Sequence, residues 1–198
     1  MRLKSLLIET EITIDEEKKE ISINATISWD KDTQPPEISY TEQQISDAVS
    51  SHSGSMSGIV TPENPDGGDY QVNFGVEFVP DAESTYDIVL SGPDKPSKVR
   101  GQGKSGKEMQ LRDGAPLEAI EHEFGHIFGD IDYYGEGTDA AGNRTTTVQE
   151  GFENNIMGRI VSGGGTTFDG RNVTRMIQSG TTSWDRHASP GVSVRTFP

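Results

Sequence analysis

The alternation of apolar and polar residues near the start of the chain predicts β-structure. Residues 3–14 and 21–29 alternate in part, and the charged run DEEKKE lies between them. This pattern is typical of a β-hairpin or of two neighbouring strands. The breaker DTQPPE at 32–37 then interrupts the pattern. We therefore expect an N-terminal β-strand extension over residues 1–35 and a main domain over residues 36–198.

The next part of the chain predicts one helix followed by strands. The segment TEQQISDAVSS begins at Thr41, whose hydroxyl suits a helix N-cap. The segments HSGSMSG at 52–58 and TPENPDGGD at 61–69 are rich in glycine and polar residues, so we expect loops there. Residues 70–80 alternate strongly and predict a strand, and YDIVLS at 86–91 predicts another.

The second half of the chain adds two helices and one more hairpin. Residues 97–111 read as a hairpin with glycines at its tip, and residues 114–128 have a helical pattern. Residues 133–147 look like a long glycine-containing loop, and RNVTRMIQS at 171–179 predicts a short helix.

Composition narrows the classes of function. The 198 residues include no cysteine, so disulfides, thiolate nucleophiles and zinc–cysteine sites are excluded. A net charge of −15 disfavours binding to nucleic acid or anionic lipid. No apolar run reaches membrane-spanning length, and the N-terminal apolar patch breaks at Glu9, too early for a signal peptide. We expect no membrane insertion, and a protein that is cytoplasmic or exported by a non-classical route.

The charge is distributed unevenly along the chain. Residues 93–112 carry six basic and two acidic side chains, whereas residues 113–155 carry ten acidic and one basic. Such runs are usually solvated surface. The acidic stretch is also compatible with a cleft that attracts a cation.

The stretch HEFGHIFGDID at 122–132 lies within this acidic region and holds two of the four histidines. On a helical projection His122 and His126 lie one turn apart, opposite a side formed by Leu117, Ile120, Phe124, Ile127 and Phe128. Two imidazoles at this spacing can bind one metal ion, and Glu123 projects at the flank of the pair. This is the logic of the His-Glu-x-x-His zinc site, in which the glutamate acts as a base.

The motif continues beyond the second histidine. Gly129 can take a left-handed conformation that ends the helix, and Asp132 follows three residues later, where it can reach the same ion. The whole pattern, with Asp in the last position, resembles the elongated signature of the metzincin zinc peptidases. Metzincins also have a turn containing Met beneath the metal, and Met157 in ENNIMGRI, 31 residues after His126, matches that turn in order and spacing.

This resemblance covers about residues 70–180 and implies an α+β, metzincin-like fold: a mixed β-sheet, an active-site helix, a Met-turn and a C-terminal helix. It implies a Zn²⁺ ion held by His122, His126 and Asp132 in a zinc-dependent endopeptidase. Glu123 would be the catalytic general base, and the substrate would be a protein or peptide. Short domains of this type also occur as bacterial effectors and polymorphic toxins.

The resemblance also raises two further expectations. Extended substrate would pair with an edge strand, supplied by residues 86–91 or by the 98–112 hairpin. Several metzincins place a Tyr two residues after the Met, where it reaches the metal or the oxyanion. Arg159 stands there in this chain, which leaves Tyr133 and Tyr134 as substitutes.

Two other interpretations remain open from the sequence. In a thermolysin-like peptidase, Glu150 or Glu153, which follow His126 by 24 and 27 residues, would be the third ligand. Alternatively, the chain is a β-rich binding module whose metal site is structural or inactive. A closed structural site usually has four protein ligands, and the sequence offers three.

Overall fold

The computed structural model describes most of the chain. The described residues are 2–4, 10–29, 40–79, 86–91, 97–103, 106–112, 114–158 and 166–185. The breaker at 32–37 lies outside these residues.

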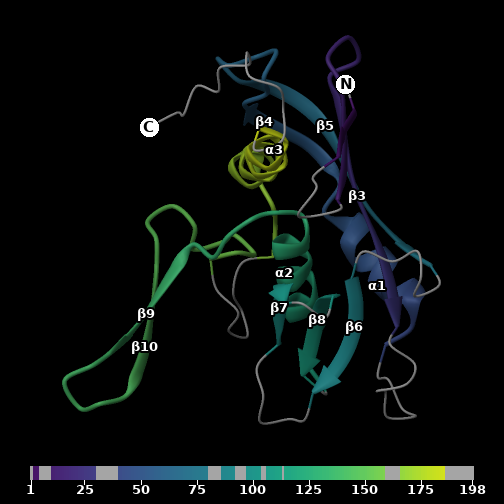
Figure 1. Ribbon diagram of the computed structural model, residues 1–198. Helices are drawn as coiled ribbons and strands as arrows, with labels where there is room; N and C mark the ends of the chain where they lie inside the picture. The colour runs from purple at the N-terminus through teal and green to yellow at the C-terminus, as the bar shows by residue number, and fades with distance from the viewer. Residues whose placement is uncertain are drawn as a thin grey trace.

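Within these residues the fold is α+β, with one mixed sheet, a separate two-stranded ribbon and three helices (Figure 1). The eight strands described in the sheet are β1 (Arg2–Lys4), β2 (Glu11–Asp15), β3 (Glu20–Trp29), β4 (Gly54–Ile59), β5 (Gly68–Phe78), β6 (Tyr86–Ser91), β7 (Lys98–Gly103) and β8 (Gly106–Arg112). The ribbon consists of β9 (Tyr134–Thr138) and β10 (Arg144–Val148). The helices are α1 (Glu42–Ser51), α2 (Leu117–Ile127) and α3 (Gly170–Asp185).

Strand β3 connects the parts of the sheet. It pairs antiparallel with β2 and parallel with both β5 and β6. Its alternate residues Ile21, Ile23, Ala25 and Ile27 are buried, as the alternating pattern predicts. The strands of residues 1–35 therefore share one sheet with the strands of the main domain.

The far side of the sheet ends in strand β7. Strand β6 pairs parallel with β8, and β8 pairs antiparallel with β7. Among the described strands β7 has β8 as its one partner, so its second edge is unpaired within the sheet. Of the two segments expected as substrate edge, residues 86–91 form the internal strand β6, and β7 of the hairpin is at the edge.

Helix α1 begins at a capping residue, as the sequence predicts. Thr41 forms a capping box at α1, because its hydroxyl accepts from the Gln44 backbone N–H and the Gln44 side chain accepts from the Thr41 N–H. Helix α1 then buries Ile45 and Val49. Helix α3 is longer than the predicted 171–179, and it packs beside β4 and β1.

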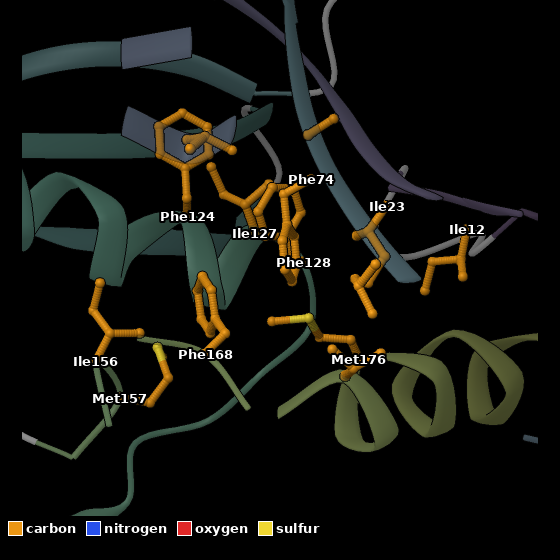
Figure 2. Packing of buried hydrophobic residues seen from close by; sticks show 14 of the residues in the cluster. Ile12, Ile23, Phe74, Phe124, Ile127, Phe128, Ile156, Met157, Phe168 and Met176 are labelled. Atoms are coloured by element: carbon orange, nitrogen blue, oxygen red, sulfur yellow. The ribbon is translucent and has the colours of Figure 1, made fainter. Parts of the chain in front are cut away.

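The core joins α2, the sheet and α3 (Figure 2). Phe74 of β5 packs against Phe128 and Phe168, with ring centroids 5.5 and 5.1 Å apart. Met157 and Met176 are fully buried at this cluster, Met176 on the side of α3 and Met157 beside Ile156. The helix that carries the histidine motif is therefore held against the sheet by apolar contacts on one face.

Two segments that we expected to be loops are paired strands. Residues 54–59 form β4, which pairs with β5 and buries Met56 and Ile59, so the partner strand overrides the weak β-propensity of Gly and Ser. Residues 134–148 form the β9–β10 hairpin, which projects from the body of the protein (Figure 1). Its turn is closed by Asp139, whose carboxylate accepts from the backbone of residues 141 and 143.

No helix in the described part of the chain is long and apolar enough to cross a membrane.

The β2–β3 turn is joined to the β4–β5 hairpin through Glu16. Its carboxylate accepts hydrogen bonds from the Thr61 hydroxyl at 2.5 Å, the Tyr70 hydroxyl at 2.6 Å and the Lys19 ammonium at 2.8 Å. Partial burial alone would raise the pKa of Glu16, but these three donors lower it from 4.5 to about 2. The ionised form of Glu16 therefore stabilises the fold.

We expect Glu16→Gln to lower the free energy of unfolding at neutral pH by roughly 1 kcal/mol, because charge-assisted hydrogen bonds are lost. The folded-state pKa is depressed, so this contribution is present above pH 4.5 and disappears as the pH falls toward 2. Urea unfolding at several pH values measures the difference between variant and wild type. Glu17→Gln, at an exposed neighbour in the same turn, is the control. A difference that is independent of pH between 4.5 and 2 contradicts this role.

Candidate metal centre

Helix α2 presents the His-Glu-x-x-His segment from inside the protein. Ile120, Phe124, Ile127 and Phe128 of its predicted apolar face are buried in the core, whereas Leu117 at the start of the helix is half-buried. The opposite face is covered as well, because His122 and Glu123 are 1% and 2% exposed. The side chain of His126 keeps 23% of its surface exposed, so the site opens to solvent on that side. The helical pattern of α2 could not predict that this second face is covered, because the covering residues, such as Ile156, lie far along the chain.

Helix α2 ends in a Schellman motif that turns the chain back toward the histidines. The N–H of Asp130 donates to the carbonyl of Gly125, and the N–H of Gly129 donates to the carbonyl of His126. Gly129 has a φ of 99°, which only glycine adopts without strain. This confirms the expected left-handed turn. It brings Asp132 back alongside the helix.

His122, His126 and Asp132 form one cluster that can hold a metal ion. Oδ1 of Asp132 lies 3.0 Å from Nε2 of His122 and 3.4 Å from Nε2 of His126. One potential ligand atom from each residue lies within 4.8 Å of the other two. The two imidazole rings are perpendicular, with centroids 4.9 Å apart. Three ligand atoms at this spacing can surround a single ion.

The outer nitrogen of each imidazole is held by a backbone carbonyl. Nδ1 of His122 lies 2.9 Å from the carbonyl oxygen of Ile156, and Nδ1 of His126 lies 3.2 Å from that of Asp130. A carbonyl oxygen only accepts hydrogen bonds, so each Nδ1 carries a proton. In neutral imidazoles the Nε2 lone pairs then face the Asp132 carboxylate, and only a proton or a metal cation between them removes the repulsion.

The charge of the cluster is visible in its pKa shifts. Burial would lower the pKa of His126, but the Asp132 carboxylate and the Asp130 carbonyl raise it above its ordinary value. Burial would raise the pKa of Asp132, but hydrogen bonds and charge from both histidines hold it well below its ordinary value. Oδ1 of Asp132 is also a buried oxygen that has no hydrogen-bond donor as a partner among the described residues. The cluster therefore favours a bound cation.

Glu123 lies beside the cluster without a charged partner of its own. Its Oε2 is buried and has no hydrogen-bond partner in the described structure. Burial raises the pKa of Glu123 above its ordinary value, although the two histidines and a hydrogen bond from the Val99 backbone act in the opposite direction. A buried carboxylate with a free oxygen and a raised pKa is suited to accepting and releasing a proton.

Met157 lies in a turn that packs against helix α2. Its side chain is fully buried and contacts Gly125, which lies between the two histidines in the sequence. The N–H of Tyr133 donates to the Met157 carbonyl at 2.8 Å, which joins this turn to the segment that carries Asp132. The turn also supplies the Ile156 carbonyl that holds His122.

The two tyrosines next to Asp132 have different surroundings. Tyr133 is buried, stacks on Phe152 and donates its hydroxyl to Asp130, so its hydroxyl is engaged away from the cluster. Tyr134 is half-buried, and the centroid of its ring lies 6.3 Å from that of His122. Burial and the Asp132 charge raise the pKa of Tyr134, so the phenol stays protonated. Arg159 lies outside the described residues.

The remaining candidates lie away from the cluster. Glu150 and Glu153 are exposed, and the Glu153 carboxylate accepts from the Gly151 N–H in its own turn. His52 pairs with Glu121 at 3.2 Å, on the α1 side of α2. His187 lies outside the described residues.

Three buried polar residues around the cluster were not anticipated from the sequence. Asp130, Asn155 and Asn172 are 5%, 3% and 0% exposed, and Asn172 is hydrogen-bonded to both of the others. They are separated by as many as 42 positions, so no spacing motif connects them. The signal that could have found them is the placement of Asn172 in a predicted helix among apolar neighbours, where an amide is costly unless paired.

The contact between Gly125 and Met157 gives a test of the packing beneath the site. A Cβ added at Gly125 would collide with Met157 Sδ, so we expect Gly125→Ala to cost about 1–3 kcal/mol. Met157→Ala removes the obstacle, and the double variant should lose clearly less stability than the sum of the single variants. Gly135→Ala, where an added Cβ meets nothing within 4 Å, is the control. Denaturant unfolding measures all four proteins, and additive losses would contradict this contact.

In comparisons with known proteins, no protein family, no curated protein and no solved structure matches this chain. The chemistry of the metal centre is therefore the basis on which a function is inferred.

Proposed function

We propose that this protein is a zinc-dependent endopeptidase whose metal ligands are His122, His126 and Asp132. The observation that carries the proposal is the pair of carbonyl-held imidazoles, whose inner nitrogens meet one carboxylate oxygen. Two nitrogen ligands and one oxygen ligand suit zinc, whereas calcium and magnesium prefer oxygen ligands throughout. Three protein ligands leave a position open, as in catalytic rather than structural zinc sites.

A bound zinc ion would supply Lewis acidity, which makes water a stronger nucleophile near neutral pH and polarises a carbonyl group. The residues of the chain supply the rest of the chemistry. Glu123 takes the proton of the attacking water on its free carboxylate oxygen and delivers it to the leaving amine. The Tyr134 hydroxyl, next to Asp132, donates to the developing oxyanion.

Strand β7 offers the surface on which a substrate would bind. Its outer edge is unpaired within the sheet, and the Val99 backbone N–H is bonded to Glu123. An extended peptide that adds to this edge would pass beside the proposed general base. The exposed side chain of Ile131 lies next to Asp132 in sequence and offers an apolar contact near the same site.

The thermolysin-like alternative receives less support from the geometry. It needs Glu150 or Glu153 at the metal, and both are exposed and outside the cluster. The β-rich binding module with a structural or inactive site is separated from an enzyme by the experiments below.

The first experiment measures the metal itself. We expect one zinc ion per chain in wild type by elemental analysis and none in His122→Ala combined with His126→Ala. Asp132→Ala should bind zinc more weakly than wild type, whereas Glu150→Ala and Glu153→Ala should bind as wild type does. All affinities should fall as the pH decreases, because protons compete for the ligand atoms. Unchanged affinity in Asp132→Ala, with loss in a glutamate variant, would favour the thermolysin-like site.

The second experiment concerns Glu123. Glu123→Gln keeps the shape of the side chain and removes its basicity, so we expect zinc to be retained and the turnover rate to fall by at least about a hundredfold. Cleavage-site profiling with a peptide library measures turnover without a known substrate. Glu121→Gln, two residues away on α2, is the matched control and should retain activity. Near wild-type cleavage by Glu123→Gln excludes the mechanism. A zinc-loaded wild type that cleaves no peptide favours the binding module.

A further inference from the structure

A buried hydrogen-bond network connects helix α3 to both carbonyls that hold the histidines. Its centre is Asn172 in the first turn of α3, which is 0% exposed. The Asn172 side chain has one acceptor oxygen and two donor hydrogens. Each of these has a protein partner, so the amide is fixed in one orientation.

One branch of the network leads to His126. Nδ2 of Asn172 donates to Oδ2 of Asp130 at 2.6 Å. Oδ1 of the same carboxylate accepts from the Ile131 N–H at 2.8 Å and from the Tyr133 hydroxyl at 2.9 Å. The Asp130 side chain is thus held on both oxygens, which fixes the backbone carbonyl that accepts from Nδ1 of His126.

The other branch leads to His122. Asn172 and Asn155 exchange two amide hydrogen bonds, at 2.6 and 3.1 Å. Oδ1 of Asn155 also accepts from the Met157 N–H at 2.9 Å, so this amide closes the turn across Ile156. The Ile156 carbonyl is the group that accepts from Nδ1 of His122.

Asn172 also has an ordinary role in capping α3. Its Oδ1 accepts from the Asp169 N–H at 2.8 Å, while Asp169 accepts from the Arg171 N–H, a reciprocal arrangement like a capping box. Capping uses the oxygen of the amide alone. The side-chain nitrogen of Asn172 has no part in capping. It donates to Asp130 and Asn155, the two residues that connect α3 to the metal cluster.

We propose that Asn172 is a positioning residue, which sets the orientation of both metal-binding imidazoles through Asp130 and Asn155. The proposal rests on the proposed metal site but not on peptidase activity. Outer partners of metal-bound histidines typically change metal affinity by about 10–100-fold when they are removed. A single amide that serves both histidines would make α3 part of the metal centre, although none of its described residues belongs to the ligand cluster.

The decisive variant is Asn172→Asp. The aspartate keeps the oxygen that caps α3, but it has no donor for Asp130 and places a second carboxylate against it. We expect zinc affinity, measured by competition with a chelator, to fall by about 10–100-fold. In the metal-free protein, the downfield proton signals of the two Nδ1–H groups should weaken through faster exchange with water. Circular dichroism confirms that the variant folds.

A polarity swap tests the mechanism directly. In Asp130→Asn combined with Asn172→Asp, the amide introduced at position 130 donates to the carboxylate introduced at position 172, so the bond between the two positions is restored in reverse. We expect most of the zinc affinity and both Nδ1–H signals to return, which is a non-additive effect. Thr174→Val is the matched control, because it removes the α3 hydroxyl oxygen that accepts from the Val60 N–H, a hydrogen bond outside the network. Its zinc affinity should stay within about twofold of wild type.

The outcomes separate this inference from the proposed function. Wild-type affinity and unchanged Nδ1–H signals in Asn172→Asp overturn the inference, as does an equal loss of affinity in Thr174→Val. If Asn172→Asp does not fold, the swap variant decides, and a folded swap variant with weak zinc binding overturns the inference. A wild type that binds no zinc refutes the proposed function, and the proton signals then still test the positioning role.

Discussion

The site depends on two hydrogen bonds in which backbone carbonyls accept from the outer nitrogens of His122 and His126. A carbonyl cannot donate, so it fixes which nitrogen carries the proton and which lone pair is turned inward. Without these two bonds the imidazoles could rotate or exchange tautomers, and the same motif would not define a site. The geometry of the metal cluster thus depends on the position of two backbone carbonyls as well as on the three side chains.

The fold supplies these carbonyls from separate parts of the chain. The Schellman turn at Gly129 places the Asp130 carbonyl at the end of α2, and the turn that contains Met157 supplies the Ile156 carbonyl. The core between α2, β5 and α3 holds both turns in place through apolar packing. The polar side chains of Asp130, Asn155 and Asn172 can remain buried near the cluster because they are hydrogen-bonded to one another.

The sequence predicts what is determined by local geometry. The spacing of His122, Glu123 and His126 on a helix, and the glycine turn before Asp132, depend on a short stretch of backbone, and the ligand atoms do converge there. The carbonyls could not be predicted, because every residue carries one and only tertiary structure selects two of them. Strand β4 escaped prediction for a similar reason, since its glycines and serines form a strand only against β5. The Asn172 network joins positions too distant for any pattern to connect.

The exposed β9–β10 hairpin offers a place to attach a reporter group. It starts two residues after Asp132, yet its strands pair with each other and nearly all its side chains are exposed. Its tip, closed by Asp139 and by Gly142 at a φ of 86°, is exposed throughout. A fluorophore or an affinity tag inserted at the tip would therefore be carried by a ribbon rooted at the metal centre, while the core is left intact. Such a reporter would be sensitive to events at the cluster, because the Tyr134 ring at the base of the ribbon lies with its centroid 6.3 Å from that of His122.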